Sequence, residues 1–256
     1  MPAAPHTSFW IALLVGIASG SIGPFILLRR MALVGDALSH VALPGIALAL
    51  IYHLDPFYGV VVFLIGAAFL VYWLEGRSRV PPDAIVGLLF TASLAIGILM
   101  LPNADVIESL FGAFPVLSTP LLVAILVAAV ILSALCFWLA KRFLFMIVSP
   151  DLAKVHGVGR AYDLALLLIF AAIVALGIKL VGTLLMGALT IIPASIAKNL
   201  SQSMRRYVIL SAVFGGAISV AGVWLAESFH FLPGPAIVLL GVAVFAVTLP
   251  FSRRPA

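Results

Sequence analysis

The chain alternates long apolar stretches with short polar breaks, and this pattern predicts a series of membrane-spanning helices. A helix that crosses a bilayer needs about 20 predominantly apolar residues. The predicted segments are 8–28, 37–52, 57–74, 84–101, 119–140, 161–179, 182–197, 207–226 and 235–251. Because 37–52 and 182–197 are short, we interpret them as half-spans, tilted helices or continuations of a neighbour. We therefore expect eight or nine spans.

Basic residues between the apolar stretches predict which loops share one side of the membrane, since loops rich in Lys and Arg face the cytoplasm. The segments 53–56, 102–118 and 227–234 contain no Lys or Arg, and they alternate with basic clusters. We expect the clusters and the C-terminus inside and, with nine spans, the N-terminus outside. The clusters are Arg29 with Arg30, Arg77 with Arg79, Lys141 with Arg142, Lys154 with Arg160, Lys198 with Arg205 and Arg206, and Arg253 with Arg254.

The amino-acid composition supports the same prediction of a membrane protein. Of 256 residues, 64% are hydrophobic and 9% are charged, whereas a soluble domain has about 25% charged residues. Lipid accepts such an apolar surface, so soluble and disordered classes are excluded. The fold class is an all-α polytopic transmembrane helical bundle, one domain over residues 1–256. The net charge of +5 belongs to the loop clusters and gives no reason to expect nucleic acid. Gly16 and Gly20 form a GxxxG pattern that predicts close helix packing.

Polar residues within apolar segments are candidates for function because they are costly in lipid. Asp36 and His40 are four residues apart, which places them on one helical face about 6 Å apart. A carboxylate and an imidazole so placed can bind a divalent ion. His40 would lie roughly 15 Å from the Arg30 end, near the middle of the bilayer. Pro44 and Gly45 are expected to loosen the helix, as at transporter sites built from broken helices. The alternative is an Asp–His hydrogen bond that only locks the helix.

Two side chains are too few to hold a metal ion tightly. In a two-fold dimer with this helix near the axis, two copies of Asp36 and His40 would supply four ligands.

The sequence offers other candidate cation ligands, for which the signal is weaker. His53 beside Asp55, and Glu227 with His230, lie in segments expected outside, where they either attract cations or are plain solvated residues. Asp105 and Glu108 in the outer loop 102–118 are open to the same two interpretations.

The longest inner loop contains a short helical segment. Ser149 or Asp151 can cap it and Gly157 can end it. Such a helix suits docking to a cytoplasmic partner, or it is a surface helix without one. The chain has no GxxxxGK[ST], HExxH or GxSxG motif, so ATP binding through a phosphate loop and hydrolase chemistry are unsupported. We expect a transport protein rather than an enzyme.

Three stretches together resemble a known family, and they cover nearly the whole chain: RRMALVGDALSHVALPGIALAL (29–50), SPDLAKVHGVG (149–159), and VGTLLMGALTIIPASIAKNLSQSMRRY (181–207) followed by FHFLPGPAIVLL (229–240). They resemble the membrane permeases of zinc- and manganese-importing ABC transporters. The first stretch is the most specific. Met186 and Gly187 depart from the plainly small or aliphatic pair expected at that place.

The resemblance implies a homodimeric, type II ABC importer-like permease in the bacterial inner membrane. Its implied partners are two cytoplasmic ATPase subunits and an extracytoplasmic metal-binding protein. Zn²⁺ or Mn²⁺ would be transported, with no permanently bound cofactor, and iron stays possible. Asp36 and His40 would lie in the metal path. The residues implied to couple to the ATPase are Asp151, Leu152, Ala153, His156 and Gly157. The alternatives are a secondary ion-coupled metal transporter and a permease for a siderophore- or cobalamin-type chelate.

Overall fold

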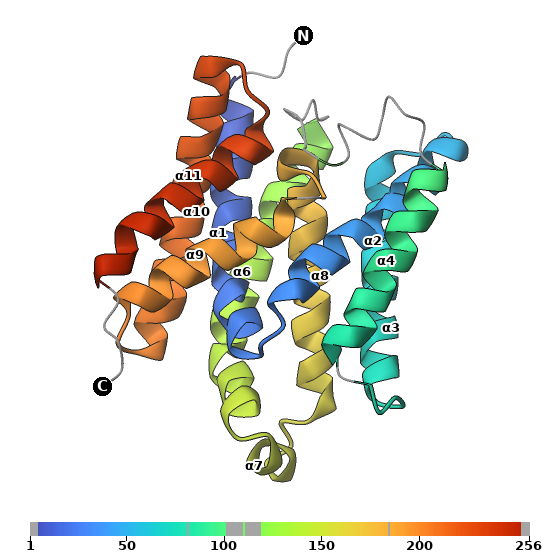
Figure 1. Ribbon diagram of the computed structural model, residues 1–256, viewed down its shortest axis with the longest axis vertical. Coiled ribbons are helices and arrows are strands. Elements are labelled where there is room, and N and C mark those ends of the chain that lie inside the picture. Colours follow the sequence, from blue (N-terminus) through green and yellow to red (C-terminus); the bar gives the residue numbers. More distant parts are fainter. Residues whose placement is uncertain (1–4, 81, 101–109, 111–118, 184, 252–256) are drawn as a thin grey trace.

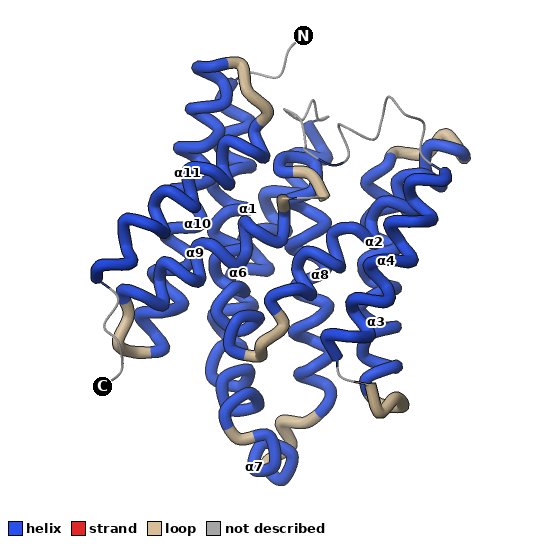
Figure 2. The backbone as a smooth tube through the Cα atoms, viewed as in Figure 1, coloured by secondary structure: helices blue, strands red, loops and turns tan. Residues whose placement is uncertain are grey.

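The described part of the chain is built of helices and loops (Figure 2). The computed structural model describes residues 5–80, 82–100, 110, 119–183 and 185–251. The α-helices are α1 (Pro5–Leu28), α2 (Ala32–Ile51), α3 (Pro56–Glu75), α4 (Pro82–Met100), α6 (Thr119–Val148), α7 (Pro150–Val155), α8 (Arg160–Val181), α9 (Met186–Leu200), α10 (Met204–Phe229) and α11 (Pro233–Thr248), followed by the 3₁₀ turn η1 (Leu249–Phe251). The predicted all-α transmembrane bundle is confirmed.

The nine predicted segments all correspond to helices, although their lengths differ from expectation. Seven helices in the described residues are long and apolar enough to cross a membrane, and Ala84–Met100 is a shorter apolar one. Helix α9 has 15 residues and spans about 22 Å, so the short segment predicted at 182–197 is confirmed. The short segment predicted at 37–52 is wrong, because α2 begins at Ala32 and has 20 residues. Helix α6 continues past 140 to Val148, since Phe143 and Met146 are buried.

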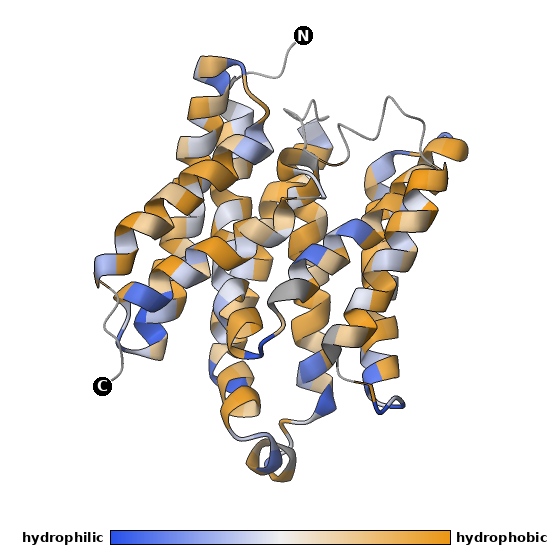
Figure 3. Cartoon of the chain, in the orientation of Figure 1, coloured by the Kyte–Doolittle hydropathy of each residue, from blue (hydrophilic) through white to orange (hydrophobic). Residues whose placement is uncertain are grey.

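The basic loops gather at one end of the bundle. Figure 1 places the turns after α3 and α9 and the α7 segment toward its lower end, and the α2–α3 and α10–α11 turns at the opposite end. This arrangement agrees with the predicted alternation of basic and non-basic loops. Residues 253–254 and the outer loop residues Asp105 and Glu108 lie outside the described residues. Hydropathy is high over most helices, and a hydrophilic stretch interrupts it within α2 (Figure 3).

Helices α1 and α10 pack against each other through small residues, as the GxxxG pattern predicts. A Cβ atom added to Gly20 would overlap the carbonyl of Ser211, and one added to Gly16 would overlap that of Gly215. The Ser211 hydroxyl donates a hydrogen bond to the Gly20 carbonyl over 2.5 Å. In lipid, helices associate through close packing and interhelical hydrogen bonds rather than through apolar burial. This contact therefore stabilises the bundle that carries the candidate site.

We expect Gly20→Leu to destabilise the fold, because the new side chain meets the backbone of α10. Over-packing of this kind costs about 1–3 kcal/mol and occasionally more. The measurement is the unfolding midpoint in detergent, together with the monodisperse fraction on gel filtration. Gly66→Leu on α3 is the matched control, since nothing lies within 4 Å of a Cβ at Gly66. Equal stability of the two variants would contradict the packing argument.

Candidate functional site

Asp36 and His40 lie on α2, four residues apart, as the sequence predicts. The His40 Nε2 atom is 3.9 Å from the Asp36 Oδ1 atom. His40 is buried, with a side chain 3% exposed, whereas the Asp36 side chain is 44% exposed. The carboxylate is thus partly accessible from outside the chain, and the imidazole lies behind it. A cation that reaches Asp36 would also meet the Nε2 atom of His40.

The imidazole of His40 is held by an aromatic side chain that the sequence did not single out. Phe90 of α4 packs edge to face against it, with ring centroids 4.9 Å apart and planes at 77°. The His40 Nδ1 atom has no hydrogen-bond partner among the described residues. Burial of an imidazole nitrogen without a partner is unfavourable unless function requires it. Aromatic spacing along α4 gave no signal for this contact, because it depends on how α2 and α4 pack.

A close approach of two helix backbones fixes the position of Asp36. A Cβ atom on Gly187 of α9 would lie 2.8 Å from the Asp36 nitrogen and 3.0 Å from its Cα. A Cβ on Gly35 would lie 3.3 Å from the Gly187 Cα. The two glycines therefore allow α9 to touch α2 at the site itself. Gly187, which departs from the family pattern in the sequence, has a steric reason to be glycine.

The expected loosening of α2 at Pro44 and Gly45 is wrong, because α2 continues without interruption to Ile51. Pro44 cannot donate a hydrogen bond to the carbonyl of His40, but the loss of one bond does not end the helix in this packed setting. Gly45 has a packing role instead: a Cβ there would overlap the carbonyl of Gly59 on α3. The site is thus built on a continuous helix rather than a broken one.

The site offers two side chains of the types that can ligate a metal ion. No group of three or more His, Cys, Asp and Glu side chains that could hold a metal occurs among the described residues. A zinc site needs four ligands, of which at least three usually come from protein. One copy of the Asp36–His40 pair is therefore incomplete as a binding site for a bare ion.

The other histidines lie away from this pair. His53 and His230 both have left-handed backbone conformations, with φ of 55°, and both are exposed in turns. Asp55 caps α3 by accepting a 2.8 Å hydrogen bond from the Phe57 backbone nitrogen. Within the described residues, no salt bridge joins Glu227 to His230. Glu227 lies in the last turn of α10, and the other three residues lie in the connections next to helix ends. The structure brings none of the four to Asp36.

The segment predicted to couple to an ATPase forms α7, which begins at Pro150 directly after Ser149. Gly157 ends it with φ of 74°, and the Val158 nitrogen donates to the Ala153 carbonyl over 2.8 Å. Asp151, Leu152, His156 and Gly157 are exposed, whereas Ala153 is fully buried. Ala153 therefore anchors α7 to the bundle rather than offering its side chain to a partner.

Val155, which the sequence analysis did not select, is the most exposed apolar side chain of α7. It is 82% exposed and Leu152 is 57% exposed. The three-residue spacing of these two side chains on a short helix was the available signal, since residues three apart share a face. Together they form an apolar tip at the end of the bundle where the basic loops gather.

These features define a polytopic helical membrane protein with an Asp–His pair on one face of α2. The chain belongs to the ABC 3 transport family, whose profile matches residues 5–252. The family predicted from the sequence is confirmed: a membrane permease subunit of the kind found in zinc and manganese ABC importers.

Several relatives match along almost the whole chain. The chain is 32% identical over 248 residues to the manganese transport system membrane protein MntC of Listeria monocytogenes, covering 94% of this chain and 88% of that protein. It is 28% identical over 253 residues to the high-affinity zinc uptake system membrane protein ZnuB of Haemophilus influenzae, covering 95% and 97%. The solved structure of PsaBC from Streptococcus pneumoniae in complex with Fab matches with a TM-score of 0.81 and 31% identity, covering 95% of this chain and 90% of that one.

Proposed function

We propose that this chain is the transmembrane subunit of an ATP-driven importer of Zn²⁺ or Mn²⁺ in the bacterial inner membrane. Two copies form the metal path, two cytoplasmic ATPase subunits drive it, and an extracytoplasmic metal-binding protein delivers the ion. Relatives named for manganese and for zinc both support a divalent metal substrate. The permease itself carries out no covalent chemistry.

The observation that carries this proposal is the incomplete ligand pair at the edge of the protomer. Asp36 is 44% exposed, and His40 faces it from a buried position. A second copy related by a two-fold axis beside α2 would bring another carboxylate and another imidazole to the same ion. Four such ligands suit tetrahedral Zn²⁺, or form part of the larger shell of Mn²⁺.

The two alternatives explain fewer of the observations. A secondary transporter could use the same pair as a proton relay, but it has no use for the apolar tip of Leu152 and Val155. A permease for a bulky metal chelate shares the architecture, but the chelate already supplies the coordinating ligands of its metal ion. It has no need of a carboxylate and an imidazole four residues apart.

The proposed function is tested by reconstituting the chain with its ATPase and binding protein in vesicles. We expect uptake of labelled Zn²⁺ or Mn²⁺ that requires ATP and both partners. Competition between the two ions identifies the preferred one. Equal uptake without ATP would favour the secondary transporter, and uptake of a chelate but not of the bare ion would favour the chelate permease.

The docking role of α7 makes a separate prediction. Val155→Asp places a charge on the apolar tip, and we expect it to weaken binding of the ATPase by about ten-fold or more, as at a buried interface position. Affinity is measured by titrating the ATPase onto the permease in detergent. Leu54→Asp is the matched control, because Leu54 is 59% exposed in the α2–α3 turn at the opposite end of the bundle. Unchanged affinity in the Val155 variant would contradict the docking role.

A further inference from the structure

Arg29 joins three helix ends that are far apart in the sequence. Its Nη2 atom lies 2.8 Å from the Asp163 Oδ1 atom and 3.2 Å from the Glu75 Oε1 atom. Glu75 is the last residue of α3, and Asp163 lies in the first turn of α8. The three side chains are only 16–28% exposed, so solvent screens this network less than a surface ion pair.

The turn that carries Arg29 is itself well defined. The Arg30 nitrogen donates to the Leu27 carbonyl over 3.2 Å, and the Met31 nitrogen donates to the Ile26 carbonyl over 3.1 Å. With Arg30 at φ of 59°, this is the hydrogen-bond pattern of a Schellman turn at the end of α1. Helix α2 begins three residues after Arg29, and Asp36 follows about 6 Å further along its axis. A displacement of Arg29 therefore reaches the start of the helix that bears the metal ligands.

The first turn of α8 receives contacts from the other inner helix ends as well. The Arg160 guanidinium lies over the ring of Tyr72 on α3, 5.1 Å from its centroid. Arg142 of α6 donates a hydrogen bond to the Tyr162 hydroxyl. Because residues 156–159 connect α7 directly to this turn, a movement of α7 acts first on residues 160–163. Of the α8 residues that make these contacts, Asp163 is the one that pairs with the α1–α2 turn.

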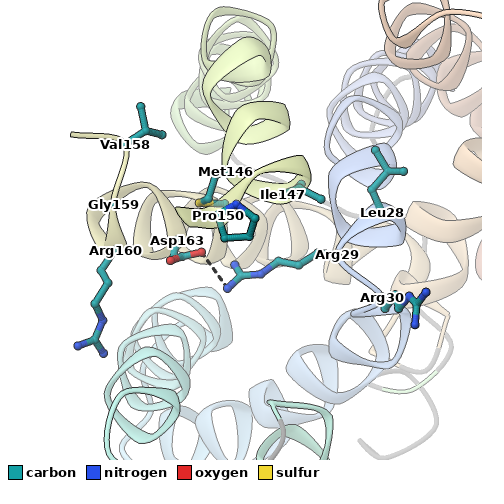
Figure 4. Close-up of a pocket in the computed structure, with 10 residues that line it drawn as sticks. All are labelled: Leu28, Arg29, Arg30, Met146, Ile147, Pro150, Val158, Gly159, Arg160 and Asp163. Atoms are coloured by element: carbon teal, nitrogen blue, oxygen red, sulfur yellow. Dashed lines mark ion pairs between the residues drawn. The ribbon is translucent and has the colours of Figure 1, made fainter. Parts of the chain in front are cut away.

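The network lies beside a cavity that leaves room for movement. The cavity has a volume of about 320 Å³, and Arg29, Pro150 and Asp163 are among the residues that line it. Figure 4 shows Arg29 extended toward Asp163 beneath Pro150, the first residue of α7, whereas Arg30 points away from the pair. The α7 segment and the α1–α2 turn thus face each other across a space that packing does not fill.

We propose that Arg29 is a positioning residue that transmits movement of α7 to α2, by pairing with Asp163 and Glu75. When the ATPase moves α7, the first turn of α8 moves with it, and Arg29 carries that movement to the start of the helix with Asp36 and His40. This inference rests on the proposed function, since it requires an ATPase at α7. It assigns to Arg29 a role in addition to that of a positive charge on the cytoplasmic side, which its place in a basic cluster suggests.

The experiment compares ATP hydrolysis with metal uptake in the reconstituted complex. We expect Arg29→Gln to keep ATP turnover while the number of ions moved per ATP falls about ten-fold, within the range by which single substitutions change coupling between sites. Arg29→Lys should restore most of the ratio, because a single nitrogen makes both contacts. Arg30→Gly is the matched control: it keeps the turn, removes the neighbouring charge and should leave the ratio unchanged.

Loss of Arg29 alone leaves two carboxylates without their cation, which can prevent folding. The triple variant Arg29→Gln, Glu75→Gln, Asp163→Asn removes every charge of the network. It therefore tests the same role without leaving unpaired carboxylates. An unchanged ratio in the triple variant would overturn the proposal, and so would a proportional fall of hydrolysis and uptake. An equal effect of Arg30→Gly would also overturn it. Absence of ATP-dependent uptake in the wild-type complex would instead overturn the proposed function.

Discussion

Replacing Asp36 by Asn is expected to lower metal uptake by about 100-fold or more, since loss of even an indirect partner of a metal ligand costs 10–100-fold. The amide keeps the size of the carboxylate but loses its charge, and neutral amide oxygens bind Zn²⁺ and Mn²⁺ poorly. In a two-fold assembly, one substitution removes two of four protein ligands. Initial uptake rates in vesicles with the ATPase and binding protein measure the effect.

His40→Gln should cause a comparable loss, because it removes the imidazole nitrogen that faces Asp36 at 3.9 Å. Ser39→Ala is the control within the same helical turn. Ser39 is fully buried, and its hydroxyl donates only to the Asp36 carbonyl over 2.7 Å. It should leave uptake within a few-fold of wild type. Normal uptake in either the Asp36 or the His40 variant, with the complex assembled, would remove both residues from the metal path.

The helical periodicity of the sequence was sufficient to predict that Asp36 and His40 lie close together, and it predicted most of the bundle. Residues four apart share a helical face wherever the helix lies, so the Asp36–His40 geometry follows from local structure alone. The apolar lengths likewise predicted the helices, because a bilayer imposes a minimum span. The apolar length was misleading for α2, because the predicted segment began at 37, after Asp36, whereas the helix begins at Ala32. A single carboxylate does not end a helix that packs mainly on α3, α4 and α9.

Features that depend on packing between distant helices were not predictable. Ala153 was among the residues implied to couple to an ATPase, and the structure shows that its side chain is fully buried. Pro44 and Gly45 suggested a broken helix, yet Gly45 faces Gly59 and the helix continues. The sequence showed Arg29 only as one of several basic residues expected on the cytoplasmic side. Its ion pairs with Glu75 and Asp163 depend on how α3 and α8 are arranged. Each of these outcomes depends on contacts that sequence spacing does not encode.

Gly187→Val is expected to reduce uptake about 10- to 100-fold without touching a ligand, since a displacement near 1 Å at a functional site can cost that much. The new Cβ would lie 2.8 Å from the Asp36 nitrogen and 3.0 Å from its Cα, and both atoms belong to the backbone. No side-chain rotation relieves such a contact, so α9 and α2 must separate at the site. The paired copies of Asp36 and His40 would then no longer meet one ion together.

The substitution series separates this effect from a general loss of stability. Gly187→Ala introduces the same Cβ with less bulk, so its uptake should fall between wild type and Val. Gly87→Val on α4 is the matched control, because nothing lies within 4 Å of a Cβ at Gly87. The proposed binding of an ATPase at α7 should persist in all three variants. If Gly187→Val retains wild-type uptake, then the close approach of α9 does not position Asp36, and the ligand pair tolerates movement of α2.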